Sequence, residues 1–279
     1  MKDKQLIETG LNINWFPGHM KKGTDELVKI SKQIDLIIEV LDARAINSSS
    51  NDEIIEIFNN KPIIKIALKS DYSTTSSSGN VLVGSIKNKN FKQTIIKHIY
   101  SVLDTKIKHL KSKGLVQPKF TILVVGLPNV GKSSLINFLK SKNVLIAQNM
   151  PGVTKKQRLI AINENFNMID TPGILFKRIN KIETAYKLVL INCIKKEILT
   201  LEHVLKFGFE HYKKYHYQDL LNYYKLSKIT DYYDFVEQVC KTKYWFLQNS
   251  ELDLSRFENN VFNDFSLGKI CKTNFDLEK

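Results

Sequence analysis

A glycine-rich segment of the type that binds nucleotide phosphates lies near the middle of the chain. Residues 126–133 read Gly-Leu-Pro-Asn-Val-Gly-Lys-Ser, a complete G-x-x-x-x-G-K-S pattern. In such a loop, glycines let successive backbone N–H groups curl around phosphate oxygens at the start of a helix. The lysine reaches the β- and γ-phosphates, and the serine hydroxyl binds Mg²⁺. We therefore predict a phosphate-binding loop with Lys132 also catalytic and Ser133 a magnesium ligand. Its nucleotide-binding residues are Asn129, Val130, Gly131, Lys132, Ser133 and Ser134.

Two further segments carry polar groups that a magnesium-bound triphosphate needs. Residues 170–173 read Asp-Thr-Pro-Gly and follow an apolar run downstream of the loop. We predict that the Asp170 carboxylate holds Mg²⁺ through water, and that the Gly173 amide contacts the γ-phosphate and takes part in catalysis. Residues 151–154 read Pro-Gly-Val-Thr and offer the Thr154 hydroxyl as a second magnesium ligand. Each tetrapeptide alone is also an ordinary turn, so the prediction depends on its position relative to the loop.

A base-recognition motif precedes the glycine-rich loop instead of following it. P-loop GTPases read guanine through Asn-Lys-x-Asp at the end of a strand, and residues 68–71 read Leu-Lys-Ser-Asp. We predict that the Asp71 carboxylate accepts from the guanine N1 and N2 donors. The residues assigned to base recognition are Lys69, Ser70, Asp71, Gly84 and Ser85. The order of motifs along the chain is therefore a circular permutation.

Leu68 departs from this motif, because it replaces the asparagine that normally bonds the base and braces the phosphate loop. If those bonds are not replaced, we expect nucleotide affinity to weaken by about 1–3 kcal/mol. Guanine selectivity need not be lost, since Asp71 makes the discriminating pair of bonds.

Alternating elements are expected to position these motifs. Apolar, β-branched runs predict buried strands at 35–41, 62–68, 81–84, 120–125, 159–162 and 166–169. Helices are expected at 20–33, 51–59, 91–113 and 132–140, and the third has an apolar face from Phe91 to Leu110. From about Glu183 onward the pattern is helical and rich in aromatics. We predict an α/β domain over 1–178 and a small helical domain over 179–279.

The sequence resembles the ribosome biogenesis GTPase A family, also called YlqF/RbgA. The permuted order, the segment Trp15-Phe-Pro-Gly-His-Met20 and the segment Leu41-Asp-Ala-Arg44 carry this resemblance. It implies a circularly permuted Ras-like P-loop GTPase domain followed by an all-α C-terminal domain. It also implies GTP hydrolysis coupled to late assembly of the large (50S) ribosomal subunit, with the C-terminal domain contacting ribosomal RNA. GTP or GDP and Mg²⁺ are the implied ligands.

The resemblance bears on catalysis as well. Ile174 occupies the place where many GTPases carry a glutamine that orients the attacking water, and an aliphatic side chain cannot do this. The resemblance points to His19 for that role, whereas the residues alone favour a histidine that caps or packs at a helix start. Asn129 resembles an asparagine that supports a potassium ion in related GTPases.

Composition sets the class of protein and of partner. The chain has 279 residues, 42 Lys plus Arg, 28 Asp plus Glu and a formal net charge of +14. No apolar run approaches the roughly 20 residues that cross a bilayer, and the three cysteines lie far apart. We therefore expect a cytoplasmic protein that has no membrane partner. The family resemblance implies that it binds a large-subunit precursor with its rRNA, and we expect it to be monomeric off the ribosome. Residues 87–119 hold nine Lys and one Asp, and this segment either contacts RNA phosphates or is a solvated surface.

Two alternatives to an enzyme that hydrolyses GTP stay open. In one, Leu68 marks an RNA-binding assembly scaffold with weak or degenerate nucleotide binding. In the other, the protein is an ATPase, because guanine selection is compromised. The intact magnesium-binding set argues against a scaffold, which has no need of it.

Overall fold

The computed structural model describes residues 30–51, 57–58, 60–77, 79–140, 158–171, 179 and 181–277. Its internal contacts divide the described chain into two units. Residues 30–71 and 75–171 belong to an α/β unit, and residues 72–74 together with 179–277 belong to a helical unit. Each unit is described separately.

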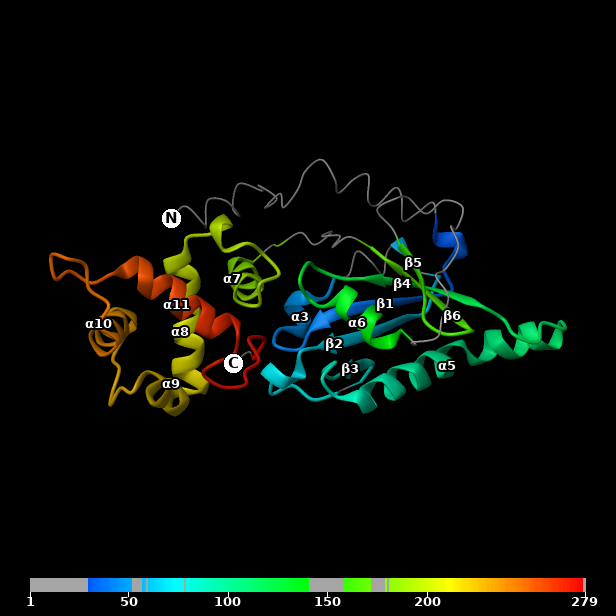
Figure 1. Cartoon of the computed structure of the whole chain (residues 1–279), viewed down its shortest axis with the longest axis horizontal. Coiled ribbons are helices and arrows are strands. Elements are labelled where there is room, and N and C mark those ends of the chain that lie inside the picture. The colour runs from blue at the N-terminus through cyan, green and yellow to red at the C-terminus, as the bar shows by residue number, and fades with distance from the viewer. Residues whose placement is uncertain are drawn as a thin grey trace. The chain divides into compact units, whose positions relative to one another are not determined.

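The α/β unit is built on a six-stranded sheet in the described residues, with the order β3-β2-β1-β4-β6-β5 (Figure 1). The strands are β1 (Leu36–Asp42), β2 (Ile63–Leu68), β3 (Val81–Val83), β4 (Phe120–Val125), β5 (Arg158–Ala161) and β6 (Phe166–Asp170). All neighbours pair in parallel except β5, which is antiparallel to β6. The observed sheet confirms the predicted α/β fold class.

The core explains why the central strands are continuous apolar runs. Every residue of β1 and β4 is buried. Because side chains alternate between the faces of a strand, burial along the whole strand requires both faces to be covered. Leu123 and Val125 of β4 pack in one cluster with Ile30, Ile34 and Phe58. Val124, which lies between them, faces the opposite side of the sheet.

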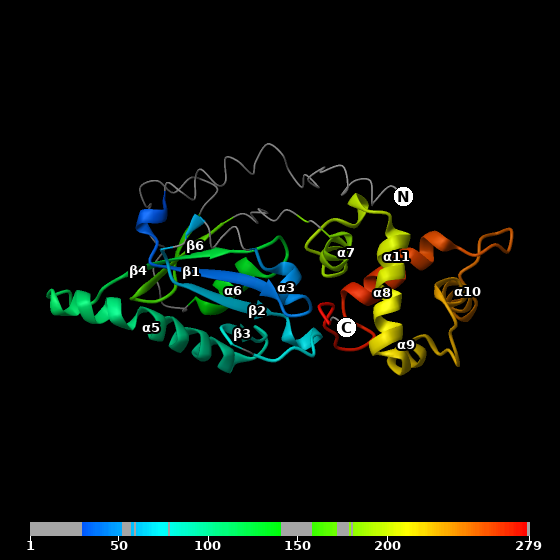
Figure 2. The ribbon, with the colours of Figure 1, turned by 180° about the vertical axis from the view of Figure 1, so that it is seen from behind.

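The sheet order also confirms the permutation. β1, β2 and β3 precede β4 in the chain, yet they extend the same sheet in parallel with it. Carboxyl ends of parallel strands meet at one edge, so the segments that follow β2, β3, β4 and β6 are brought to the same edge. Figure 2 shows β1, β2 and β4 running side by side in this sheet.

Three helices accompany the sheet in the described ranges: α3 (Ile46–Ser49), α5 (Lys89–Ser112) and α6 (Lys132–Leu139). Asn88 caps α5, its side chain accepting from the Asn90 N–H. The buried residues of α5 are Phe91, Ile95, Ile99 and Leu103. The predicted apolar face thus packs over its first half, whereas Ile107 and Leu110 stay only half-buried. The short segments η1 (Ser31–Gln33) and η2 (Ser70–Tyr72) are 3₁₀ turns.

The helical unit contains α7 (Ile182–Leu190), η3 (Lys196–Ile198), α8 (Leu201–Tyr215), α9 (Tyr217–Tyr224), α10 (Tyr232–Lys243) and α11 (Leu254–Ser266). Its aromatic residues form a core in which Phe209 stacks on Phe235 with ring centroids 5.0 Å apart. Gly208 allows α8 to approach α11, because a Cβ there would lie 2.6 Å from the Phe265 ring. Within the described ranges, no helix has the length and apolar character needed to span a membrane.

Candidate nucleotide-binding site

The glycine-rich loop joins β4 to α6 in a conformation that requires its glycines. Gly126 has φ +144°, and a Cβ there would lie 2.4 Å from the Val40 carbonyl oxygen of β1. Gly131 has φ +107°, precedes α6, and would bring a Cβ within 3.0 Å of Leu68 Cδ1. A side chain at either position would fill the space beside the neighbouring strand end, so the loop is a close-fitting backbone cradle.

Lys132 lies against this cradle. Its side chain is buried, and its ammonium donates to the carbonyl oxygens of Gly126, at 3.1 Å, and Leu127, at 2.8 Å. The Lys132 charge therefore lies at the loop that the sequence predicts to bind phosphate. The N–H groups at the start of α6 add to the positive potential there.

The predicted magnesium ligands of α6 and β6 meet. Ser133 Oγ donates to Asp170 Oδ2 at 2.9 Å, although the two residues are 37 positions apart. The other carboxylate oxygen, Oδ1, is buried without a hydrogen-bond partner in the described part of the chain. Thr171, the residue directly after β6, donates from Oγ1 to the Val124 carbonyl of β4 at 2.8 Å. An orphaned carboxylate oxygen beside a hydroxyl fits a hard divalent cation such as Mg²⁺.

The two predicted base-recognition segments also lie together. The Ser70 N–H donates to the Gly84 carbonyl at 3.3 Å, and the Gly84 N–H donates to the Ala67 carbonyl at 3.0 Å. Lys87 forms an ion pair with the Asp71 carboxylate. Burial alone would raise the pKa of Asp71, but bonds from Lys87 and Ser85 hold that pKa below its ordinary value. Asp71 is therefore an ionised acceptor, which is the state that guanine N–H donors require.

A buried ion network fixes the position of the base-recognition strand relative to the phosphate loop. Asp42, at the end of β1, is fully buried and accepts from Arg44 Nε at 2.9 Å and Arg44 Nη2 at 2.8 Å. Lys69 Nζ donates to Asp42 Oδ2 at 2.7 Å and to the Asn129 carbonyl at 2.8 Å. Burial would raise the pKa of Asp42, yet Arg44 and Lys69 lower it overall. The network joins the ends of β1 and β2 to the phosphate loop.

This network supplies a brace that the Leu68 substitution was expected to remove. The Lys69 bond to the Asn129 carbonyl ties the base-recognition segment to the phosphate loop. Leu68 itself is buried, and its Cδ1 lies beside Gly131. Loop bracing is thus retained by an ammonium and by packing, while the asparagine bond to the base is not replaced by the leucine.

Sequence reasoning missed some functional residues and reached others that the structure does not describe. It used Asp42 and Arg44 only as family markers, and it did not single out Lys87 as a partner of Asp71. The signal for Lys87 is its place two residues after Ser85, at the same sheet edge. The predicted residues His19, Thr154 and Gly173, and also Ile174, lie outside the described residues.

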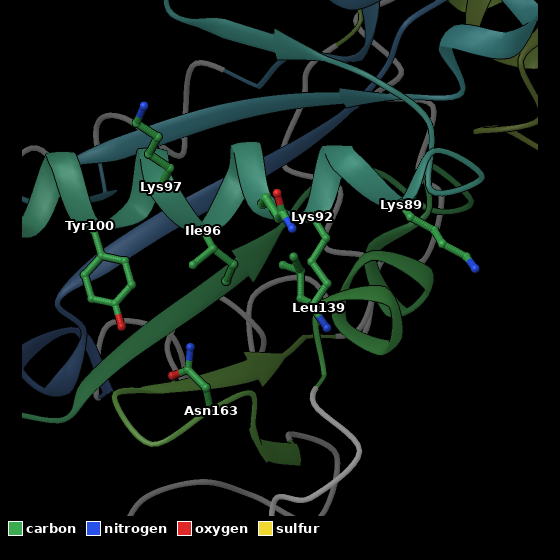
Figure 3. A pocket seen from close by; sticks show the side chains of 8 residues that line it. Lys89, Lys92, Ile96, Lys97, Tyr100, Leu139 and Asn163 are labelled. Carbon is green, nitrogen blue, oxygen red and sulfur yellow. The ribbon is translucent and has the colours of Figure 1, made fainter.

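The lysine-rich segment borders a cavity on the α/β unit. The cavity has a volume of about 630 Å³ and is lined by Lys89, Lys92, Gln93, Ile96, Lys97, Tyr100, Leu139 and Asn163 (Figure 3). Lys92 donates to the Lys140 carbonyl at 3.0 Å. Farther along α5, Lys106 pairs with Asp35 and Lys108 pairs with Asp104. Lys106 and Lys108, two lysines of the segment considered for RNA contact, therefore already have carboxylate partners.

Comparison with known proteins places the chain in a family. A probable ribosome biogenesis GTPase A from Mycoplasma pneumoniae is 40% identical over 271 residues, covering 97% of this chain and 98% of the relative. The chain belongs to the ribosome biogenesis GTPase A family. A relative of that name from Bacillus pumilus is 31% identical, with 79% of this chain and 82% of the relative covered. The model of a family described as 50S ribosome-binding GTPase matches residues 121–229.

Solved structures agree on the fold of this GTPase. The GNP-bound YlqF of T. maritima has a TM-score of 0.63 at 20% identity, covering 91% of this chain and 97% of that one. The structure titled GDP-bound TM YlqF has a TM-score of 0.64 at 19% identity, with 90% and 98% covered. At these identities the likeness supports the α/β unit and the helical region as a shared fold.

Replacing Asp42 with asparagine tests the buried network. The Asp42→Asn variant leaves the Arg44 and Lys69 cations close together without a carboxylate. Removing one partner of a buried ion pair costs about 3–5 kcal/mol. We expect the free energy of unfolding, measured by urea denaturation at neutral pH, to fall by about 3 kcal/mol.

The pH dependence gives this prediction a second readout. Because the folded-state pKa of Asp42 is lowered, its stabilisation is present above the unfolded pKa, about 3.9, and is lost as pH falls through the folded pKa. The variant should lack this acid-dependent component. Asp104→Asn is the matched control, since Asp104 forms an exposed pair with Lys108 that contributes less than about 1 kcal/mol. Equal losses in the two variants would contradict the role of Asp42.

Proposed function

We propose that the protein binds GTP with Mg²⁺, hydrolyses it to GDP and phosphate, and couples hydrolysis to late assembly of the large ribosomal subunit. The observation that carries this proposal is the convergence of three kinds of group at one edge of the sheet. The phosphate loop follows β4, the Ser133–Asp170 pair joins α6 to β6, and the Asp71 segment follows β2. The family and the names of its members support the ribosomal setting.

Each polar group has a defined task in this proposal. Lys132 stabilises negative charge on the β- and γ-phosphates, and the Gly173 amide contacts the γ-phosphate. Ser133 and Thr154 hold Mg²⁺ directly and Asp170 holds it through water, and the bound ion neutralises the charge that develops on the phosphate oxygens. The backbone oxygen of Asn129 accepts from Lys69, so support for a potassium ion would come from the Asn129 side chain.

Base selection assigns the remaining residues of the site. Asp71 pairs with the guanine N1 and N2 donors, and Lys69 lies along the base while bracing the phosphate loop. Ser70, Gly84 and Ser85 shape the base pocket through the hydrogen bonds between their segments. Lys87 keeps Asp71 ionised but is itself 67% exposed, so its pairing is weak enough for a base to share the carboxylate.

Asp71→Asn tests nucleotide selection. An asparagine amide presents a donor where guanine also presents donors, so one or both base bonds are lost. We expect the variant to bind fluorescent GDP and GTP at least about 10-fold more weakly, while the exposed control Asp104→Asn binds like the wild type. In the wild type, equal affinity for ATP would support an ATPase. Absence of nucleotide binding would support a scaffold, and either result contradicts the proposal.

We propose His19 as the group that orients the attacking water when the ribosome is bound, because Ile174 cannot do so. Its removal should lower GTP turnover at saturating large subunits by about 10²-fold or more, the range of a lost acid–base group, without changing GDP affinity. His109→Ala, at an exposed position of α5, is the matched control. An unchanged rate in His19→Ala would exclude this role.

We propose that the lysines at the α5 cavity contact phosphates of ribosomal RNA. Lys89, Lys92 and Lys97 are among the residues that line the cavity, and Figure 3 shows Lys92 pointing toward Leu139. If each neutralises one phosphate, replacing all three with Gln should weaken binding to large-subunit precursors and reduce the logarithmic salt slope by about 2–3. The matched control is Lys106→Gln with Lys108→Gln, since both lysines already pair with carboxylates. Equal effects in both sets would point to net charge alone.

The helical C-terminal region, residues 179–279, is proposed as a second ribosome- and RNA-contacting domain. It carries 15 basic and 14 acidic residues, so recognition there depends on shape or on a local patch more than on net charge. A cytoplasmic protein that is monomeric off the ribosome fits the same proposal.

A further inference from the structure

A cluster of metal-ligand side chains lies in the helical unit, outside the residues assigned to nucleotide. His216, Asp219 and Cys271 each offer one donor atom, and these atoms all lie within 4.8 Å of one another. The cluster therefore offers three kinds of donor: an imidazole nitrogen, a carboxylate oxygen and a thiol sulfur. The three residues come from the junction of α8 and α9, from the first turn of α9, and from the segment after α11.

The orientation of His216 makes the cluster more than a chance grouping. Its Nε2 lies 2.9 Å from Thr273 Oγ1, while its Nδ1 lies 3.8 Å from Asp219 Oδ2. Thr273 is buried and also lies 2.7 Å from His211 Nε2. The threonine hydroxyl has one proton, so it can donate to one of the two imidazoles and accept from the other. In the tautomer in which it donates to His211, its oxygen accepts from His216 Nε2–H. His216 Nδ1 is then unprotonated and faces Asp219.

This arrangement has the outer contact that histidine ligands of metals require. A ligating imidazole usually donates its second ring N–H to an oxygen acceptor, which fixes both ring orientation and tautomer. Thr273 supplies that acceptor and is itself held by His211 and by the bond from its N–H to the Tyr72 carbonyl, at 3.1 Å. The imidazole is therefore positioned before any ion arrives.

The donor set selects the kind of cation. Nitrogen, sulfur and carboxylate oxygen together suit Zn²⁺, whereas Mg²⁺ and Ca²⁺ prefer oxygen alone. A thiolate and a carboxylate also balance the charge of one divalent ion. Donors around tetrahedral zinc lie roughly 3.3–3.7 Å apart, given metal–ligand distances of about 2.0–2.3 Å. The donor atoms lie within 4.8 Å of one another, so binding requires the cluster to contract, and the half-exposed Asp219 side chain is free of packing that would prevent this.

We propose that His216 Nδ1, the Asp219 carboxylate and the Cys271 thiolate bind one Zn²⁺ ion, with water as the fourth ligand. On binding, the thiol proton is released to solvent and a sulfur–zinc bond forms. The ion ties the chain after α11 to the α8–α9 junction. In Figure 1 the red C-terminal segment lies beside the lower ends of α8 and α9, and the Thr273 contacts with His211 and His216 place it there. The site links two segments of the helical unit, and it does not depend on the proposed nucleotide chemistry.

Cobalt titration of the full-length, nucleotide-free protein after chelation tests the site. Co²⁺ replaces Zn²⁺ and reports its ligands by colour: a thiolate ligand gives a near-ultraviolet charge-transfer band, and four-coordinate geometry gives strong visible bands. We expect one equivalent of Co²⁺ to produce both, and one equivalent of Zn²⁺ to abolish both. Cys271→Ser should remove the charge-transfer band, and Asp219→Asn should weaken Co²⁺ affinity by about 10-fold or more.

Matched controls separate this site from other cation sites. Cys240→Ala removes a buried thiol outside the cluster, and Glu237→Gln removes an exposed carboxylate of α10, so both should titrate like the wild type. Cobalt at the Ser133–Asp170 pair has only oxygen ligands and gives no thiolate band. The proposal is overturned if the wild type, folded by circular dichroism, shows no thiolate band with excess Co²⁺. It is equally overturned if the band survives in folded Cys271→Ser.

Discussion

One buried carboxylate links the segments of the candidate nucleotide-binding site. Asp42 ends the central strand β1 and is reached by two cations from two directions, Arg44 from the following turn and Lys69 from the end of β2. A buried carboxylate without such partners would be protonated or would destabilise the fold. Because Lys69 also donates to the Asn129 carbonyl, the same charge balance extends to the phosphate loop. The Lys69 ammonium thus links the predicted base-recognition segment to the phosphate loop, because it bonds both Asp42 and the loop backbone.

This linkage explains how a degenerate motif is tolerated. In the usual motif, an asparagine side chain braces the phosphate loop, but here the Leu68 side chain cannot form a hydrogen bond. Two side chains replace the asparagine as the brace. Leu68 fills the space beside Gly131, and the Lys69 ammonium donates to the backbone of the phosphate loop. Lys69 adopts a left-handed backbone with φ +65°, which directs its side chain back toward β1 and the loop. Loop positioning is therefore retained, while in the proposed site direct recognition of the base depends more heavily on Asp71.

Much of this organisation could be predicted from the sequence because its signals are local. The strand before the phosphate loop was placed at 120–125, which is the observed β4, and the order of motifs correctly indicated the permuted sheet. Interactions between distant segments carry no local signal. Ser133 and Asp170 were expected to serve one magnesium ion because of the positions of their motifs, but their direct hydrogen bond was not predicted. The pairing of Lys87 with Asp71 needed the sheet edge to be known. The cluster of His216, Asp219 and Cys271 has no recognisable spacing in the sequence, because α10 and α11 lie between the cysteine and the other two residues.

The structure also changes how the net charge and the aromatic residues are understood. Many aromatics of the helical unit, such as Tyr212, Tyr224 and Phe235, are fully buried in its core and cannot stack on bases. Lysines on α5 are likewise unequal, since Lys106 and Lys108 are already paired with carboxylates. A cation that has a carboxylate partner must give up that contact to bind phosphate, so it gains less than an unpaired one. The proposed contact with a polyanion is for this reason assigned to the cavity beside the first half of α5, where the buried face of the helix anchors it to the sheet.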